Sequence, residues 1–378
     1  MSDSPLNLNP GVEYQCENRF WQGCPTILRT PRGRLFAGWY SGGVAEPDPN
    51  NYCLLVRSDD DGWTWSKPEL VIPSDKEKDY LNIDIQLWLD PLNRMWLFYT
   101  QRRFGGLPNS DPGHLVLWAA VCDDPDADKL QWHEPRIVSH GFLRTQPTVL
   151  SNGDWVMCDY DWTSPNYRYS RSSDQGKTWT RCEAGRKLTP DFDEGMILER
   201  KDKTLLMLLR DRKPLLAQCT SSDLEGSSWK GGDFTSVLGG NSRIFLRRLQ
   251  SGRVLLIHNS AVKRTNLCAE LSEDDGATWR YSLQLDNADN PNGFISYPDA
   301  VQAPDGRIFI VYDCGRVSFK EIRMAQITED DIVSGHLTNY SSYLKRIISK
   351  APGTPDPARF EPFRQEAQNW HIKQSKRS

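Results

Sequence analysis

The sequence contains no long apolar run. No stretch approaches the roughly 20 consecutive apolar residues that a membrane-spanning helix needs. The first residues, Met1-Ser2-Asp3-Ser4, have neither the basic start nor the apolar core of a secretory signal peptide. We therefore expect a soluble, cytoplasmic protein that does not associate with a membrane.

Signals for cysteine pairing and metal binding are also missing. The nine cysteines include no Cys-x-x-Cys pair, and several lie in apolar runs, as Cys53 does in Tyr52–Val56. This pattern predicts buried thiols in a reducing compartment. Because no metal-ligand spacing occurs elsewhere, we expect no metal requirement and no other cofactor.

The chain has little net charge. Its 46 basic and 50 acidic residues leave a formal charge of −4, which provides no general attraction for nucleic acid. We expect no nucleic-acid partner, and the composition favours no particular oligomeric state.

One short phrase, Ser-x-Asp-x-Gly-x-Thr-Trp, is present in three full copies. They are Ser58–Trp65, Ser172–Trp179 and Ser272–Trp279, and a degenerate fourth copy is Ser221–Trp229. A fifth survives only as Trp132. Ser and Asp side chains hold tight turns by bonding to nearby backbone N–H groups, and Gly allows a positive φ. We therefore interpret each phrase as a hairpin turn whose Trp fixes it to a neighbouring sheet.

A longer unit recurs between these turns. A short strand passes through a Gly or Asp turn into an apolar strand, and this happens six times. The strand pairs are 25–28 with 35–40, 85–89 with 95–99, 147–150 with 155–157, 196–199 with 205–209, 244–246 with 254–257, and 300–302 with 308–312. Radial repetition of four-stranded sheets is a β-propeller.

We therefore predict an all-β fold, a six-bladed β-propeller of four-stranded antiparallel blades. Residues 1–350 would form a single domain, with the N-terminal residues pairing with the last blade to close the ring. Thr328 would cap a short helix, residues 340–350 would form another, and residues 351–378 would form a polar, helical or irregular tail.

A six-unit propeller with these turns resembles the sialidase (neuraminidase) superfamily, where the turns are called Asp-boxes or BNR repeats. The resemblance covers about residues 20–335 and implies a site with three arginines for a sugar carboxylate. It also implies a Tyr nucleophile assisted by Glu, and an Asp acid/base. A neutral Tyr suits an anionic sugar because the sugar would repel a carboxylate nucleophile.

Four positions match this site in chain order. Glu194 opens the fourth unit, and Arg210 follows its next strand. Arg264 precedes a Ser-x-Asp turn, and Tyr297 begins the sixth unit where the nucleophile is expected. The resemblance thus implies that Tyr297 and Glu194 are catalytic and that Arg210 and Arg264 bind the substrate carboxylate.

Two positions depart from the pattern. Gly23 stands where the first arginine belongs, so Arg243 is our candidate for a substitute, with Arg144 a weaker one. The acid/base is expected in the loop after Tyr40, where Asp48 aligns best and Glu46 is close.

These departures leave three functional hypotheses. The first is a sialidase-like exo-glycosidase acting on a terminal, acidic sugar of a small oligosaccharide or glycoside. The second is a propeller lyase or rhamnosidase-like enzyme acting on rhamnosyl-glucuronate glycans. A lyase needs a base for the C5 proton, for which His258 or Tyr297 is a candidate. The third is a non-catalytic glycan-binding propeller.

Overall fold

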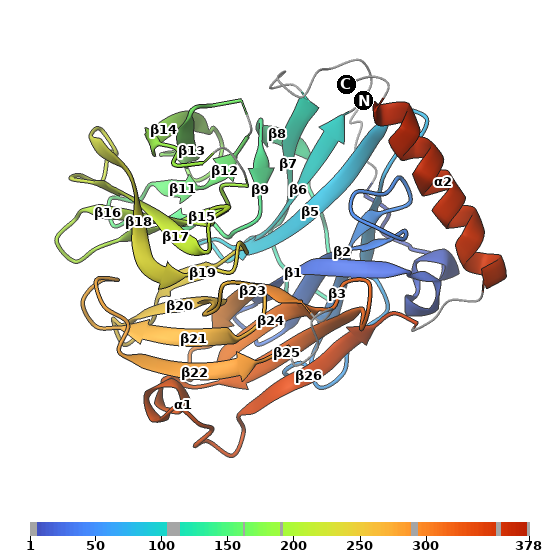
Figure 1. Cartoon of the computed structure of the whole chain (residues 1–378). Coiled ribbons are helices and arrows are strands. Elements are labelled where there is room, and N and C mark those ends of the chain that lie inside the picture. Colours follow the sequence, from blue (N-terminus) through green and yellow to red (C-terminus); the bar gives the residue numbers. More distant parts are fainter. Residues whose placement is uncertain are drawn as a thin grey trace. The chain divides into compact units, whose positions relative to one another are not determined.

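Six four-stranded sheets contain almost all the strands of the computed structural model, which describes residues 6–103, 114–161, 163–189, 192–288, 294–352 and 357–375 (Figure 1). They are the antiparallel blades of a six-bladed β-propeller, as the repeats predict. The strand orders are β1-β2-β3-β4, β5-β6-β7-β8, β10-β11-β13-β14, β15-β16-β17-β18, β19-β20-β21-β22 and β23-β24-β25-β26. A two-stranded sheet pairs β9 with β12.

The strands of the first three sheets are β1 (Trp21–Arg29), β2 (Leu35–Gly42), β3 (Tyr52–Ser58), β4 (Leu70–Pro73), β5 (Tyr80–Leu89), β6 (Met95–Arg103), β7 (Leu115–Cys122), β8 (Arg136–Ser139), β10 (Thr148–Val149), β11 (Trp155–Met157), β13 (Asn166–Ser172) and β14 (Thr180–Arg186). The strands of the small sheet are β9 (Phe142–Leu143) and β12 (Asp159–Tyr160).

The strands of the other three sheets are β15 (Gly195–Glu199), β16 (Leu205–Leu209), β17 (Leu215–Ser221), β18 (Trp229–Leu238), β19 (Phe245–Arg248), β20 (Val254–Asn259), β21 (Leu267–Ser272), β22 (Tyr281–Asp286), β23 (Ile295–Gln302), β24 (Ile308–Cys314), β25 (Glu321–Ile327) and β26 (Tyr343–Lys350). The helices are η1 (Val12–Tyr14), η2 (Cys16–Asn18), α1 (Glu329–Ser334) and α2 (Pro357–Ser375).

The contacts of the chain divide it into two compact units. Unit 1 comprises Met1–Phe142, Val311–Arg323 and Ile347–Ser378, and unit 2 comprises Leu143–Ile310 and Met324–Arg346. The single domain expected over residues 1–350 stays a prediction. Within the described ranges, no helix is long and apolar enough to cross a membrane.

Each Ser-x-Asp phrase joins the third and fourth strands of its sheet, as predicted. In the copy that follows β13, the Ser172 hydroxyl accepts the Gly176 N–H at 2.8 Å. The Asp174 carboxylate accepts the N–H and the hydroxyl of Thr178, at 2.9 and 2.6 Å. Gln175 and Gly176 both have positive φ, +60° and +80°. The turn therefore needs a glycine at its second left-handed position, and the side chains of Ser172 and Asp174 hold it closed.

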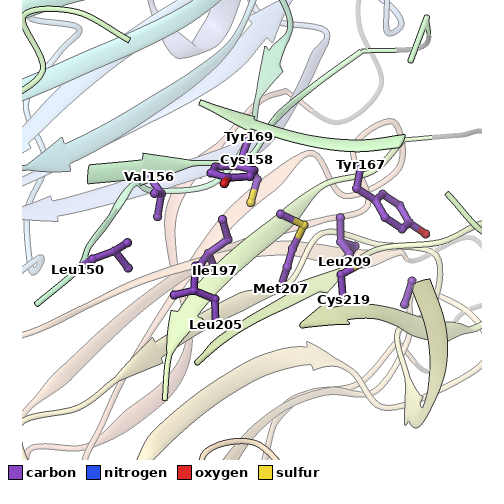
Figure 2. Close-up of a cluster of buried hydrophobic side chains, with 11 residues drawn as sticks. Leu150, Val156, Cys158, Tyr167, Tyr169, Ile197, Leu205, Met207, Leu209 and Cys219 are labelled. Atoms are coloured by element: carbon purple, nitrogen blue, oxygen red, sulfur yellow. The ribbon is translucent and has the colours of Figure 1, made fainter. Parts of the chain in front are cut away.

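The core of unit 2 lies between the sheets that begin at β10 and β15. Figure 2 shows buried side chains of both sheets meeting, among them Val156, Ile197 and Met207. Trp229 of the degenerate fourth turn packs against this cluster, and its ring centroid lies 5.7 Å from that of Tyr169. This contact confirms for one copy that the Trp fixes its turn to a neighbouring sheet. The predicted thiol burial also holds, because Cys158 and Cys219 belong to this cluster and no disulfide joins any of the nine cysteines.

The C-terminal part of the chain differs from our expectation in two ways. Residues 343–350 form strand β26 and not a helix, because they complete the edge of the sixth sheet, where tertiary pairing outweighs local propensity. All four strands of that sheet come from residues 295–350, so within the described residues it contains no N-terminal strand. The tail is helical, one of the two forms predicted for it, and the Phe360 and Phe363 rings of α2 pack against Phe20, with centroid distances of 5.5 and 5.1 Å. The capped helix after Thr328 is confirmed as α1, which has a capping box between Thr328 and Asp331.

We expect the Ser172 hydroxyl to matter far more than that of its neighbour Ser173. Ser172→Ala leaves the Gly176 N–H without its acceptor and should lower the free energy of unfolding by about 1–3 kcal/mol. Ser173 is exposed in the same turn, so Ser173→Ala should change it by less than about 0.5 kcal/mol. Urea unfolding of both variants measures the difference, and equal midpoints would contradict this account of the turn.

Candidate functional site

A buried hydrogen-bonded group of Tyr297, Glu194 and Arg210 lies in unit 2. The Tyr297 hydroxyl donates to Glu194 Oε1 at 2.7 Å. One Arg210 nitrogen, Nη1, donates to Glu194 Oε2 at 3.0 Å and to the Tyr297 hydroxyl oxygen at 2.8 Å. Glu194 and Tyr297 are only 1% and 2% exposed. The three side chains therefore form a closed triangle around one phenol proton.

The β15–β16 hairpin brings two members of this triangle together. Gly195 pairs with Leu209 in the antiparallel register, so Glu194 and Arg210 are the next facing pair. The Arg210 N–H donates to the Glu194 carbonyl at 2.9 Å, which extends the ladder by one step. A one-residue shift of this hairpin would move both side chains to the opposite face.

The charges of the triangle fix its protonation states. Burial alone would raise the pKa of Glu194, but Arg210 and Arg144 overcome this effect and lower it to about 2. Burial raises the pKa of Tyr297 above its usual value, although nearby arginines oppose the shift. At neutral pH a protonated phenol therefore donates to an ionised carboxylate, as a tyrosine nucleophile paired with a base requires.

Three further guanidinium groups surround the Tyr297 ring. The guanidinium carbons of Arg144, Arg243 and Arg264 lie 5.3, 5.2 and 5.2 Å from the ring centroid. Arg144 Nε also lies 3.5 Å from Glu194 Oε1. Together with Arg210, four guanidinium groups thus lie close to Tyr297, and two of them, those of Arg210 and Arg144, also contact the Glu194 carboxylate. In these contacts of the described residues positive charge exceeds negative charge, which favours an anionic ligand.

Asn241 links two of these arginines and was not predicted. Its side-chain oxygen accepts Arg210 Nε at 2.7 Å, and its backbone carbonyl accepts Arg264 Nε and Nη2 at 3.1 and 2.9 Å. Asn241 has φ +49°, a left-handed conformation that Asn tolerates better than most residues. Its position directly before the fifth unit, two residues from Arg243, is the only signal that the sequence offers.

Residues 33–310 match the model of a family described as a BNR repeat-like domain. The chain belongs to the BNR repeat-like domain family. No curated protein sequence matches the chain.

Solved structures similar to this BNR repeat-like protein include one of unknown function from Dyadobacter fermentans. It is 19% identical, with a TM-score of 0.64, over 79% of this chain and 92% of that chain. The intramolecular trans-sialidase of Ruminococcus gnavus is 15% identical, with a TM-score of 0.65, over 87% and 98%. A leech intramolecular trans-sialidase is 15% identical, with a TM-score of 0.67, over 88% and 71%. At these identities the likeness shows the fold.

Gly23, where an arginine was expected, is covered by another arginine. A Cβ atom at Gly23 would lie 2.8 Å from Cδ and from Nε of Arg316, so a larger residue here would require the Arg316 side chain to shift. Arg316 forms ion pairs with Glu46 at 2.8 Å and Asp313 at 2.9 Å. These residues all lie in unit 1. Two carboxylates thus balance the guanidinium at this position.

Asp48 lies in unit 1, in the loop between β2 and β3. It is fully buried, and its carboxylate accepts the N–H groups of Val44 and Asn50 at 3.0 and 2.8 Å. Burial raises its pKa above the ordinary value for Asp, which is the direction that a general acid needs. The loop also lines a cavity of about 520 Å³ with Phe20 and Tyr52 among its walls. The acid/base role of Asp48 stays a prediction.

His258 is held by the framework of unit 2. Nδ1 lies 2.6 Å from the Leu238 carbonyl, and Nε2 lies 3.2 Å from Glu270 Oε2. The ring is 1% exposed. In the part of the chain that the structure describes, no hydrogen bond or ion pair joins His258 to Tyr297 or to Glu194. Arg243, by contrast, lies beside Tyr297.

One group of potential metal ligands is present in unit 1. The ligand atoms of Cys24, Glu46 and Asp84 lie within 4.8 Å of one another. Arg316 pairs with Glu46, so a positive charge is already present at this group. The expectation of no metal requirement stays a prediction.

We predict that the Glu194 carboxylate stabilises unit 2 in a pH-dependent way. Its folded pKa of about 2 is below its unfolded value of about 4.3, so its contribution is complete above about pH 4.3 and is lost as pH falls through 2. Glu194→Gln should lower the free energy of unfolding by about 3 kcal/mol at pH 7, because Arg210 and Arg144 lose their counter-charge. Denaturant unfolding from pH 7 to pH 3 should show this gap narrowing. The exposed Glu225→Gln serves as the control, and a gap independent of pH would contradict the ionised state.

Proposed function

We propose that this protein is a sialidase-like exo-glycosidase that removes a terminal, carboxylate-bearing sugar from a small oligosaccharide or glycoside. The observation that carries the proposal is the Tyr297 hydroxyl, 2.7 Å from the ionised Glu194 and surrounded by four guanidinium groups. A neutral nucleophile in a positively charged surrounding suits an anionic sugar, which would repel a carboxylate nucleophile. The fold of sialidases and the BNR repeat-like family membership support this reading.

In the proposed reaction, the Tyr297 oxygen attacks the anomeric carbon while its proton passes to Glu194 Oε1. The bond from the anomeric carbon to the leaving oxygen breaks, and that oxygen takes a proton from a general acid, the role for which Asp48 is the candidate from the sequence. The product of this step is a glycosyl–tyrosine with neutral Glu194 and the ionised form of that acid. The ionised group then takes a proton from water, water displaces Tyr297, and the phenolate recovers its proton from Glu194. Both displacements invert the anomeric carbon, so the overall outcome is retention.

Arg210 and Arg264 are the proposed carboxylate-binding residues, as the sequence predicts. Both belong to the hydrogen-bonded surroundings of Tyr297, and Asn241 orients both. A guanidinium binds a carboxylate with two parallel hydrogen bonds, which fixes orientation as well as charge. Arg144, beside Glu194, adds a third positive charge in the same unit.

Tyr297→Phe should lower turnover of an activated aryl glycoside of an acidic sugar at least about a thousandfold, because the nucleophilic oxygen is removed. Tyr167→Phe is the matched control, since it removes a buried hydroxyl that accepts the Leu188 N–H at 3.2 Å. Retained activity in Tyr297→Phe would refute the nucleophile assignment. Product analysis should separate the free sugar from an intramolecular anhydro-sugar, because two of the similar structures are intramolecular trans-sialidases.

The same assays distinguish the other functions. An unsaturated uronate product from a rhamnosyl-glucuronate substrate would establish a lyase in place of the glycosidase. Binding to acidic glycans without turnover by the unmodified protein would establish a glycan-binding propeller.

Arg264→Gln should weaken recognition of the acidic sugar selectively. We expect KM for the acidic glycoside to rise about 10- to 100-fold, the effect of losing a charge-assisted pair. KM for the methyl ester of the same substrate should change less than about threefold, because the ester carries no negative charge. The control is Arg280→Gln, whose side chain is 68% exposed. An equal loss for acid and ester would show that Arg264 does not bind the carboxylate.

A further inference from the structure

Arg243 lies beside Tyr297, and two of its hydrogen bonds go to backbone carbonyls. Nη2 donates to the Tyr297 carbonyl, and Nη1 donates to the Arg144 carbonyl, both at 2.7 Å. Arg243 is 1% exposed, so the ends of its guanidinium are turned to the framework and not to solvent. Because both terminal nitrogens already donate to the backbone, Arg243 is poorly placed to bind a ligand.

The backbone that Arg243 holds is in an unusual conformation. Tyr297 has φ +56°, which is strained for a non-glycine residue with a bulky side chain. Such a residue persists only where its surroundings hold it, and such residues gather at functional sites. The bond from Arg243 to the Tyr297 carbonyl is a direct restraint on this conformation.

The charge of Arg243 also acts on the phenol. Its guanidinium carbon is 5.2 Å from the Tyr297 ring centroid, within the range of a cation–π contact. A buried positive charge at this distance stabilises a phenolate more than a neutral phenol, because little water screens it. The effect increases as negative charge develops on, or returns to, the tyrosine oxygen.

We propose that Arg243 is a positioning residue for Tyr297, which fixes its left-handed backbone, links it to the segment of Arg144, and stabilises its phenolate form. This inference deepens the proposed function and rests on it for the identity of the reaction. The sequence suggests that Arg243 binds the substrate carboxylate. In this proposal Arg243 instead prepares the nucleophile. Through the same segment, Asn241 orients Arg210 and Arg264, so residues 241–243 organise the site while contributing no reacting atom.

The test compares Arg243→Gln, Arg243→Lys and Arg247→Gln in the full-length protein. Arg247 is the matched control, because it lies on β19, four residues after Arg243, and donates to the carbonyl of Pro147 at 3.1 Å. Among the described residues it forms no hydrogen bond with Tyr297. Lysine at position 243 keeps the positive charge but removes the guanidinium group that donates to both backbone carbonyls. Each variant is first checked by thermal unfolding, and the lysine variant keeps the test decisive if Arg243→Gln does not fold.

The first readout needs no substrate. The protein is labelled with 3-fluorotyrosine, whose phenol is more acidic than that of tyrosine, and Tyr297 is assigned from the ¹⁹F signal that Tyr297→Phe removes. Arg243→Gln should raise the Tyr297 pKa by about one pH unit, because a nearby cation is lost. Arg243→Lys should raise it less, and Arg247→Gln should leave it unchanged. Equal pKa values in Arg243→Gln and Arg247→Gln would overturn the inference.

The second readout separates positioning from substrate binding. Arg243→Gln should lower kcat about 10- to 100-fold, the cost of a misplaced nucleophile, while KM stays within about twofold. Partial recovery of kcat in Arg243→Lys supports the inference. A rise in KM confined to the acidic substrate and absent for its methyl ester would show that Arg243 binds the carboxylate and would overturn it. If the unmodified protein turns over no glycoside, the proposed function fails, and the Tyr297 pKa still decides the role of Arg243.

Discussion

The ionised carboxylate of Glu194 is the constraint on which the site depends. A carboxylate that is 1% exposed cannot remain charged without partners, and here its partners are Arg210 and the Tyr297 hydroxyl. Each partner needs support of its own. Arg210 is held by Asn241, and Tyr297 is held by Arg243. Compensation of this one buried charge therefore involves residues from four segments, which lie before β15, after β16, before β19 and within β23.

The repeated turns and the site are held together by different kinds of hydrogen bond, local in the turns and long-range in the site. The Ser-x-Asp turns close through bonds between residues at most four positions apart, so a short phrase specifies each turn completely. The site closes through bonds between residues far apart in the chain, such as Glu194 with Tyr297 and Arg243 with Arg144. Each turn can therefore be identified from its own short sequence motif, whereas the site residues can be found only from the order in which they follow one another along the repeats.

This distinction explains how much could be predicted. The fold follows from the repeats, and the resemblance to sialidases then implies Glu194, Arg210 and Tyr297 as site residues, because each lies at or beside an end of a recognisable strand. Asn241 and the covering of Gly23 by Arg316 could not be predicted, since each depends on a tertiary contact that leaves no periodic trace. The strand at residues 343–350 was misjudged for the same reason, because the free edge of the sixth sheet and not local propensity decides its conformation.

The arginine near Gly23 and the arginines near Tyr297 differ in how their charge is compensated. At Gly23, Arg316 is already matched by Glu46 and Asp313, so it offers little net attraction to a further anion. In the described contacts of Tyr297 the balance is reversed, with four guanidinium groups and one carboxylate, and the terminal nitrogens of Arg243 donate to two backbone carbonyls. Recognition of an anionic sugar by unit 2 would then rest on Arg144, Arg210 and Arg264. The loss of an arginine at position 23 thus does not by itself argue against an acidic substrate, because the surplus charge is supplied by the same unit that holds the nucleophile.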